Sequence, residues 1–132
     1  MAASPVLADS SYYIQLLRDR QDPLRALALA GASRDLVVCG VVRCEVGRAL
    51  RQPETLKRFQ AFWDVMVNVP TDNRLWEEVE RMLWTMDREG NTLSLTDVVI
   101  ACCAIRSNAV VLTYDADFSR IPGVRAVSRL DS

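Results

Sequence analysis

Four acidic residues of this 132-residue chain lie where strands are predicted to end or where adjoining helices begin: Asp9, Glu45, Asp97 and Asp115. In an open parallel sheet, ligands bind outside the carboxyl ends of the strands, so side chains from these positions can meet there. Carboxylates brought together repel one another, and each raises the cost of ionising the rest unless a cation compensates. Magnesium and manganese favour oxygen ligands, lower the pKa of a bound water and neutralise charge on a phosphate oxygen. The pattern therefore predicts metal-dependent hydrolysis of a phosphate ester.

Each acid also has a structural interpretation. Asp9 is a candidate N-cap for the helix that follows it. Glu45 is one helical turn away from Arg48, and such a surface pair contributes only about 0.3 kcal/mol. Ser94 and Asp97 form a capping-box variant before an apolar run. No single residue decides between the two interpretations, so the functional prediction depends on the combination.

The segment TYDADF carries two aspartates with different expected roles. Asp115 comes two residues after Thr113, where the alternating side-chain direction of a strand can aim its carboxylate at the pocket. The alternative for Asp115 is a plain turn residue. Asp117 begins a predicted helical turn, Asp-Phe-Ser-Arg, where an Asp can cap the free N–H groups. We expect Asp115 to be a metal ligand and Asp117 to reach the metal indirectly through water.

Short apolar runs alternate with helical segments along the chain. The runs are rich in β-branched residues, which pack well on a pleated surface, and are typical of buried strands. Strands are predicted at residues 6–8, 36–39, 65–69 and 110–113, with 125–127 closing the sheet. Helices are predicted at residues 11–20, 23–30, 41–51, 53–64, 73–89 and 95–107. This alternation predicts a single α/β domain over residues 1–132, with a largely parallel sheet covered on both faces by helices.

Proline and glycine residues account for several helix ends. Pro23 and Pro53 are typical of a first helical turn. Gly31 and Gly90 are expected to stop the helices that precede them.

The helix predicted at residues 73–89 has two distinct faces. Apolar residues recur at helical spacing and form one stripe towards the core: Leu75, Val79, Met82, Leu83 and Met86. Trp84 falls on the opposite face. A side chain of this size has to be covered, either by another helix of the chain or by another molecule.

Composition sets limits on function and location. The formal charge is −1, from 16 basic and 17 acidic residues, so attraction to nucleic acid has to come from a local patch. The chain has no histidine, and its cysteines lack the spacing of a zinc site. We expect reduced core cysteines in a cytosolic protein: Cys39, Cys44, Cys102 and Cys103. The start lacks the features of a signal peptide and no apolar stretch has membrane-spanning length, so we expect the protein in the cytoplasm.

Four segments of the chain resemble the PIN-domain nucleases, in particular the small VapC-like toxins of bacterial toxin–antitoxin pairs. The segments are VLADSSYYI, VVRCEVGRAL, LSLTDVVIACCAI and LTYDADF. They span nearly the whole chain and follow the order of the family. Each pattern is weak alone, but the ordered set is specific.

The resemblance implies a doubly wound sheet with strand order 3-2-1-4-5 and a shared acidic pocket. In the family, the four acids hold one or two magnesium or manganese ions, and water attacks the phosphate of RNA to leave a 5′-phosphate and a 3′-hydroxyl. Carried over, the resemblance assigns these roles to Asp9, Glu45, Asp97 and Asp115. Thr113, with Ser10 or Ser11, would hydrogen-bond near the acids. The resemblance also implies a homodimer and an antitoxin peptide that blocks the pocket.

Three alternative functions fit the sequence less well. A haloacid-dehalogenase-like phosphatase needs a second Asp two residues after the first, where this chain has Ser11, and Lys57 lies outside the strand ends where its lysine would be required. A receiver domain needs an acidic pair at the first strand end and a late-strand lysine, and neither is present. A PIN-fold interaction module without activity is the third alternative, and the presence of all four acids argues against it.

Overall fold

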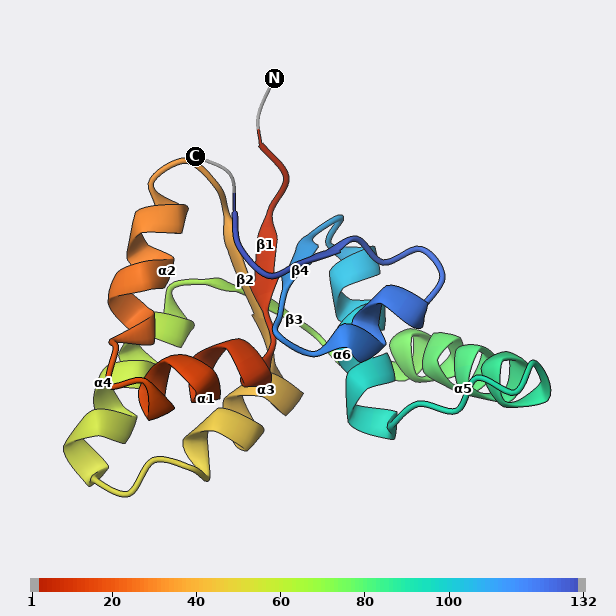
Figure 1. Cartoon of the computed structure of the whole chain (residues 1–132), viewed down its shortest axis with the longest axis horizontal. Helices are drawn as coiled ribbons and strands as arrows, with labels where there is room; N and C mark the ends of the chain where they lie inside the picture. The colour runs from red at the N-terminus through yellow and green to blue at the C-terminus, as the bar shows by residue number, and fades with distance from the viewer. Residues whose placement is uncertain (1–2, 131–132) are drawn as a thin grey trace.

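The computed structural model describes residues 3–130, and Figure 1 shows their arrangement. The strands of the central sheet are β1 (Val6–Ala8), β2 (Leu36–Cys39), β3 (Val67–Val69), β4 (Val110–Leu112) and β5 (Ala126–Val127). The helices are α1 (Ser10–Arg18), α2 (Pro23–Gly31), α3 (Gly40–Gly47), α4 (Pro53–Asp64), α5 (Asn73–Arg88) and α6 (Leu95–Arg106). A short 3-10 helix, η1 (Ala116–Arg120), separates β4 from β5.

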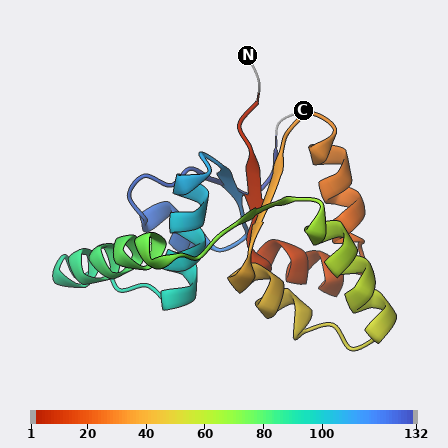
Figure 2. The ribbon, with the colours of Figure 1, turned by 180° about the vertical axis from the view of Figure 1, so that it is seen from behind.

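All strand pairs of the sheet are parallel, and the strand order is β3-β2-β1-β4-β5. β1 lies in the centre, where Val6 pairs with Leu36 of β2 on one side and with Val110 of β4 on the other. Helices α1 to α4 lie on one side of the sheet and α5 and α6 on the other (Figure 1, and from behind in Figure 2). The predicted α/β fold with strand order 3-2-1-4-5 is therefore confirmed.

The direction in which the chain builds the sheet reverses at β1. The chain runs outward from β1 through β2 to β3, and α5 and α6 then return it to β4 on the other side of β1. Connections on opposite faces of the sheet diverge at such a point and leave a crevice at the carboxyl ends of the two central strands. Asp9 directly follows β1, and Asp115 lies in the loop after β4. The fold thus brings Asp9 and Asp115, which are about a hundred residues apart in the sequence, to one crevice.

The core is apolar on both faces of the sheet. All residues of β1 and β4 are buried, as expected where helices cover both faces. In α6, every residue from Val98 to Ala104 is buried, so this helix is packed on all sides. Even so, no helix within residues 3–130 is both long and apolar enough to cross a membrane. On the opposite face of the sheet, buried Trp63 of α4 donates a hydrogen bond of 3.1 Å from Nε1 to the hydroxyl oxygen of Tyr13 in α1.

Most element ends agree with the prediction to within two residues. The helix predicted at residues 41–51 is an exception, because α3 ends at Gly47 and the chain continues in tight turns. The strand predicted at residues 65–69 begins at Val67, because Val65 caps the end of α4.

The two glycines that were predicted to stop helices behave differently. Gly90 follows α5 with a φ of +75°, a left-handed conformation that glycine adopts readily, so this prediction is correct. Gly31 lies inside the last turn of α2 without a left-handed φ, so the prediction for Gly31 is wrong. Packing explains its presence, since a Cβ atom at this position would lie 3.0 Å from Cδ1 of Leu36. The glycine lets α2 approach β2 closely.

The cysteines differ in their surroundings. All four are free thiols, and Cys39, Cys102 and Cys103 are buried, as expected. Cys44 is exposed, so the prediction of a core position is wrong for this residue. The reason is helical geometry: the buried residues of α3 are Val42 and Val46, and a residue midway between them points away from the core.

Trp84 lies on the outward face of α5, as predicted. It is 61% exposed, so no other helix in the described part of the chain covers it. Its ring packs against the side chain of Arg88, whose guanidinium carbon lies 4.4 Å from the ring centroid. Cover within the chain is therefore limited to a neighbour on the same helix.

Candidate functional site

Asp9 is buried at the carboxyl end of β1, with only 2% of its surface exposed. Its backbone N–H donates to the carbonyl oxygen of Leu112 at 3.0 Å and so extends the pairing of β1 with β4. Its side chain caps α1, because Oδ1 accepts the N–H of Tyr12 at 3.3 Å and the hydroxyl of Ser11 at 2.7 Å. The interpretation of Asp9 as a helix cap is correct. Both bonds go to Oδ1, so capping does not occupy Oδ2.

The environment of Asp9 disfavours its ionised form. Burial raises the pKa of this carboxyl group, and the negative charge of Asp115 raises it further. The nearby Ser11 and Thr113 hydroxyls and the Tyr12 N–H lower the pKa of Asp9, but they do not outweigh burial. A cation beside Asp9 would supply the missing compensation.

Hydroxyl groups connect Asp9 to the loop after β4. Ser11 Oγ lies 3.1 Å from Thr113 Oγ1 and accepts the N–H of Tyr114, also at 3.1 Å. Ser11 has a single hydroxyl proton, which it donates to Asp9, so Thr113 is the donor to Ser11. Thr113 Oγ1 in turn accepts the N–H of Asp115 at 2.9 Å. The predicted hydrogen bonds of Ser11 and Thr113 near the acids are present, and they fix the position of Asp115 relative to Asp9.

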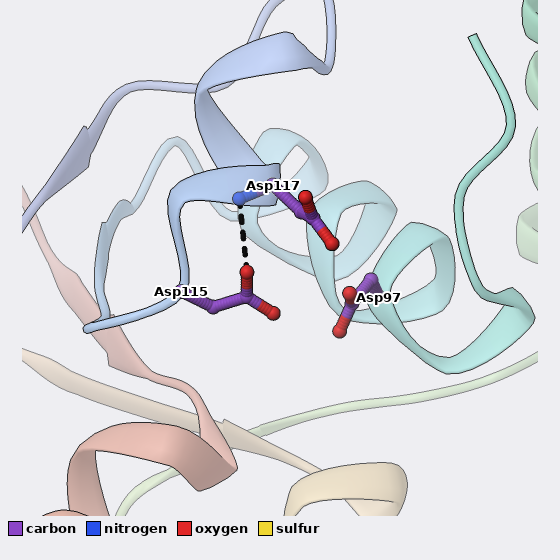
Figure 3. A group of neighbouring side chains, drawn as sticks. All are labelled: Asp97, Asp115 and Asp117. Carbon is purple, nitrogen blue, oxygen red and sulfur yellow. Dashed lines mark hydrogen bonds between the residues drawn. The ribbon is translucent and has the colours of Figure 1, made fainter.

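Asp97 lies in the first turn of α6, with its carboxylate towards the loop after β4 (Figure 3). Ser94 Oγ caps the helix by accepting the N–H of Asp97 at 3.2 Å, as the capping-box pattern predicted. Burial raises the pKa of Asp97 to about 6, and the charge of Asp115 is the next contribution. Asp97 therefore combines a capping position with a carboxylate that is costly to ionise.

The capping role predicted for Asp117 is wrong. Asp115 caps η1 instead, because its Oδ1 accepts the N–H of Asp117 at 2.9 Å. The turn begins at Ala116, so Asp117 lies inside it and cannot supply its cap. The carboxylate of Asp117 pairs with Arg120 at 3.0 Å, with both side chains about half exposed.

The carboxylates of Asp97, Asp115 and Asp117 face one another (Figure 3). One oxygen atom from each of these side chains lies within 4.8 Å of the others. All three donors are oxygen atoms with negative charge, the type of ligand that magnesium and manganese prefer. The group therefore fits a hard divalent cation, and the charges of Asp115 and Asp117 add to the effect of burial in raising the pKa of Asp97.

Glu45 faces the site from α3. It is half-buried, and its Oε1 accepts the hydroxyl of Ser10 at 2.8 Å. No ion pair within residues 3–130 joins it to Arg48, so the interpretation of Glu45 as part of a surface pair is not supported.

A cleft of about 470 Å³ opens at the carboxyl ends of β1 and β4. The four acids that the sequence singled out all line this cleft: Asp9, Glu45, Asp97 and Asp115. Asp9 and Glu45 lie outside the tight group that Asp97 and Asp115 form with Asp117. Asp117 is not part of the cleft lining, although its carboxylate lies beside two that are.

Four other residues that line the cleft were not predicted from the sequence: Ile14, Gln15, Arg18 and Tyr114. The first three lie on one face of α1, at the helical spacing that starts from Ser11. This spacing could have predicted that the three residues line the cleft, because α1 begins there. Tyr114 had no such signal, since the loop after β4 has no regular period.

A PIN domain family model matches residues 6–124 of the chain. A search of curated proteins gave no significant match. Among solved structures, the chain is similar to a chain of DNA-bound VapBC from Salmonella typhimurium, with a TM-score of 0.74 and 18% identity over 95% of this chain and 98% of that chain. For VapBC-1 from nontypeable Haemophilus influenzae the TM-score is 0.72, at 19% identity over 93% and 96%.

VapC20 from Mycobacterium tuberculosis, described as a toxin that cleaves the sarcin–ricin loop, is a third similar structure. Its TM-score is 0.61, at 16% identity over 91% of this chain and 98% of that chain. At these levels of identity, the likeness to the three structures concerns the fold.

Proposed function

The chain belongs to the PIN domain family, and we infer that it is a magnesium- or manganese-dependent endoribonuclease that hydrolyses phosphodiester bonds of RNA. The observation that carries this inference is the cleft in which Asp9, Glu45, Asp97 and Asp115 meet at the carboxyl ends of the central strands. The packing of so many carboxylates at a crevice of this kind is costly for a protein without a cation.

The metal would be held by Asp9, Glu45, Asp97 and Asp115, with Asp117 reaching it through water. A bound divalent cation lowers the pKa of a water molecule and neutralises charge that develops on a phosphate oxygen. The side chains that surround the acids have supporting roles. Ser11 orients Asp9 through the bond to Oδ1, and Ser10 orients Glu45.

Arg18 lines the cleft that the acids share and is the basic residue of that lining. A guanidinium group binds phosphate oxygens through directed, charge-assisted hydrogen bonds. In the proposed reaction, Arg18 binds a phosphate of the RNA and so offsets the repulsion between the acids and the substrate.

We further propose that the chain is the toxin of a toxin–antitoxin pair, that it forms a homodimer and that it acts in the cytoplasm, where its RNA substrate is found. Support comes from the likeness in fold to chains of VapBC complexes and to VapC20. In this proposal a cognate antitoxin binds the toxin and blocks the acidic cleft.

Incubation of the purified chain with end-labelled single-stranded RNA tests the endoribonuclease. We expect internal cleavage with magnesium or manganese and none with an excess of chelator. Asp97→Asn should be inactive, whereas Asp87→Asn, an exposed aspartate on α5, should retain activity and serves as the matched control. Cleavage that continued in the chelator, or in Asp97→Asn, would rule out the proposed chemistry. A phenyl phosphate substrate in a parallel reaction tests the phosphatase alternative, which requires release of phosphate.

Induced expression in bacterial cells tests the toxin role. We expect growth arrest with the unsubstituted chain and normal growth with Asp97→Asn at equal protein levels. Co-expression of the protein encoded next to the gene should restore growth. Normal growth with an active nuclease would argue for a housekeeping enzyme.

A further inference from the structure

A second cavity adjoins the acidic cleft and shares Tyr114 with it. This cavity has a volume of about 500 Å³ and lies between α1, α2 and the segment after β5. Its lining includes two tyrosines, Tyr12 and Tyr114, and two arginines, Arg34 and Arg129. The shared residue makes the two cavities neighbours along one surface.

The two tyrosines form a stacked pair. Their ring centroids are 5.4 Å apart and the ring planes differ by 16°. Tyr114 is 47% exposed although its ring stacks on Tyr12, and it lines both cavities, so a ligand in either cavity can contact it. An exposed aromatic face of this kind is a platform on which an unpaired nucleobase stacks.

The backbone of each tyrosine is tied to the hydrogen-bond network that holds Asp9. The N–H of Tyr12 donates to Oδ1 of Asp9 at 3.3 Å, and the N–H of Tyr114 donates to Oγ of Ser11 at 3.1 Å. Ser11 itself donates to Asp9. These bonds tie the backbone of both tyrosines to the network around Asp9 and so place the stacked pair beside the acids.

The charge of the second cavity is opposite to that of the cleft. Arg34 and Arg129 line it, and among residues 3–130 no acidic residue belongs to its lining. Arg34 is held in place by a hydrogen bond from Nη1 to the carbonyl oxygen of Ser4 at 3.3 Å, which leaves its other N–H groups for a ligand. Because the net charge of the chain is −1, phosphate binding depends on such local groups.

We propose that this cavity is a nucleotide subsite, in which Tyr114, supported by Tyr12, stacks a base of single-stranded RNA while Arg34 and Arg129 contact the adjacent phosphates. The proposal rests on the ribonuclease function inferred above and adds the place where the strand is held beside the cut. It favours unpaired RNA over duplexes, because a base inside a helix cannot offer its face to a tyrosine.

Binding of short RNA to the full chain tests the subsite separately from cleavage. The Asp97→Asn background keeps the RNA intact, and a hexanucleotide carries 2-aminopurine at each position in turn as a fluorescent probe of stacking. We expect strong quenching at one or two adjacent positions. Tyr114→Ala should remove the quenching and weaken binding about tenfold, the effect typical of one lost base–aromatic stack. Tyr114→Phe keeps the ring and should retain both.

The salt dependence of RNA affinity tests the contribution of the arginines. For single strands, each phosphate contact contributes about 0.7 to the slope of log affinity against log salt concentration, so Arg129→Gln should lower that slope by about this amount. Arg51→Gln, an exposed arginine between α3 and α4, removes the same charge outside the two cavities and should leave the slope unchanged.

The possible outcomes distinguish a failure of the proposed subsite from a failure of the proposed ribonuclease function. Unchanged RNA affinity and quenching in Tyr114→Ala, with normal metal-dependent cleavage by the unsubstituted chain, overturns the subsite and leaves the ribonuclease intact. Absence of cleavage by the unsubstituted chain overturns the ribonuclease, whereas the quenching assay still reports on the cavity. If Tyr114→Ala is no longer inhibited by an antitoxin but still binds RNA normally, the cavity binds a protein and not RNA. This result also overturns the subsite.

Discussion

The hydroxyl group of Ser10 donates a hydrogen bond of 2.8 Å to Oε1 of Glu45 and joins the first turn of α1 to α3. We expect Ser10→Ala to reduce turnover by roughly 10- to 100-fold, the range typical when a residue that orients a metal ligand is lost. The free energy of unfolding should fall by about 1 kcal/mol, the contribution of one hydrogen bond. Steady-state kinetics and chemical denaturation measure the two effects. Ser119→Ala, which removes a hydroxyl that bonds only to a nearby carbonyl oxygen, is the control and should keep full turnover.

Asp97→Asn should abolish hydrolysis and leave the fold intact. The pKa of Asp97 is raised by burial and by Asp115, so removal of this charge relieves repulsion in the metal-free protein. Its melting temperature in chelator should be equal to or above that of the unsubstituted chain, and calorimetric titration should show weaker magnesium binding. A clearly lower melting temperature of Asp97→Asn in chelator would contradict the proposed repulsion between Asp97 and the neighbouring acids.

The stability of the metal-free protein should depend on pH in a defined direction. The folded protein raises the pKa of Asp97 from 3.8 to about 6, so between these values it holds a proton that the unfolded chain releases. Stability should therefore fall as the pH rises through this window, and the raised pKa of Asp9 acts in the same direction. Urea unfolding in chelator at several pH values measures the slope. The slope should be smaller in Asp97→Asn, and equal slopes would show that Asp97 is not its source.

Substitutions of Asp115 and Asp117 should separate capping from catalysis. Asp115→Asn keeps a side-chain oxygen that can cap η1, so we expect loss of cleavage with little change in stability. Asp115→Ala should in addition cost about 1 kcal/mol for the lost cap. Asp117→Asn removes an exposed pair with Arg120, at a cost of about 0.5 kcal/mol or less, and also one of three facing negative charges, so stability should change little and turnover should fall much less. A larger loss of turnover in Asp117→Asn than in Asp115→Asn would show that Asp117 is the metal ligand and that Asp115 acts indirectly.

Trp84 is the candidate for self-association on α5. Because it is 61% exposed, a second molecule is the remaining source of cover beyond Arg88. Sedimentation should show a dimer for the unsubstituted chain and a shift towards monomer for Trp84→Ala. Leu29→Ala, an exposed apolar residue on α2, is the control. An unaltered oligomeric state in Trp84→Ala would remove this residue from the interface.

The strands and helices were predictable because their signals are local. Buried strands such as β1 and β4 are short apolar runs, and caps such as Asp9 and Ser94 precede the helices that they start. The cap of η1 was missed because Asp115 and Asp117 are two residues apart, and local pattern does not determine where such a short turn begins.

The contacts across the site were not predictable from local pattern. The stacking of Tyr12 on Tyr114 depends on the parallel pairing of β1 with β4, which places segments about a hundred residues apart side by side. The bond between Ser10 and Glu45 likewise depends on how α1 packs against α3. The resemblance to a known family implied the strand order, and this order predicted that the four acids lie close together. It did not predict these side-chain contacts.

During synthesis the N-terminal part of a chain emerges from the ribosome first, so β1 emerges before either of the strands that pair with it. Val6 can pair with Leu36 once β2 has emerged, but its other partner, Val110, follows only after α5 and α6. Until then Asp9 has no Asp115 beside it, and the acidic cleft cannot close. Chains that end at a premature stop codon between α6 and β4 contain Asp9, Glu45 and Asp97 but lack Asp115, so their acidic site is incomplete. Because the ribosome is itself built largely of RNA, the order of the strands keeps the cleft incomplete beside it until β4 has emerged.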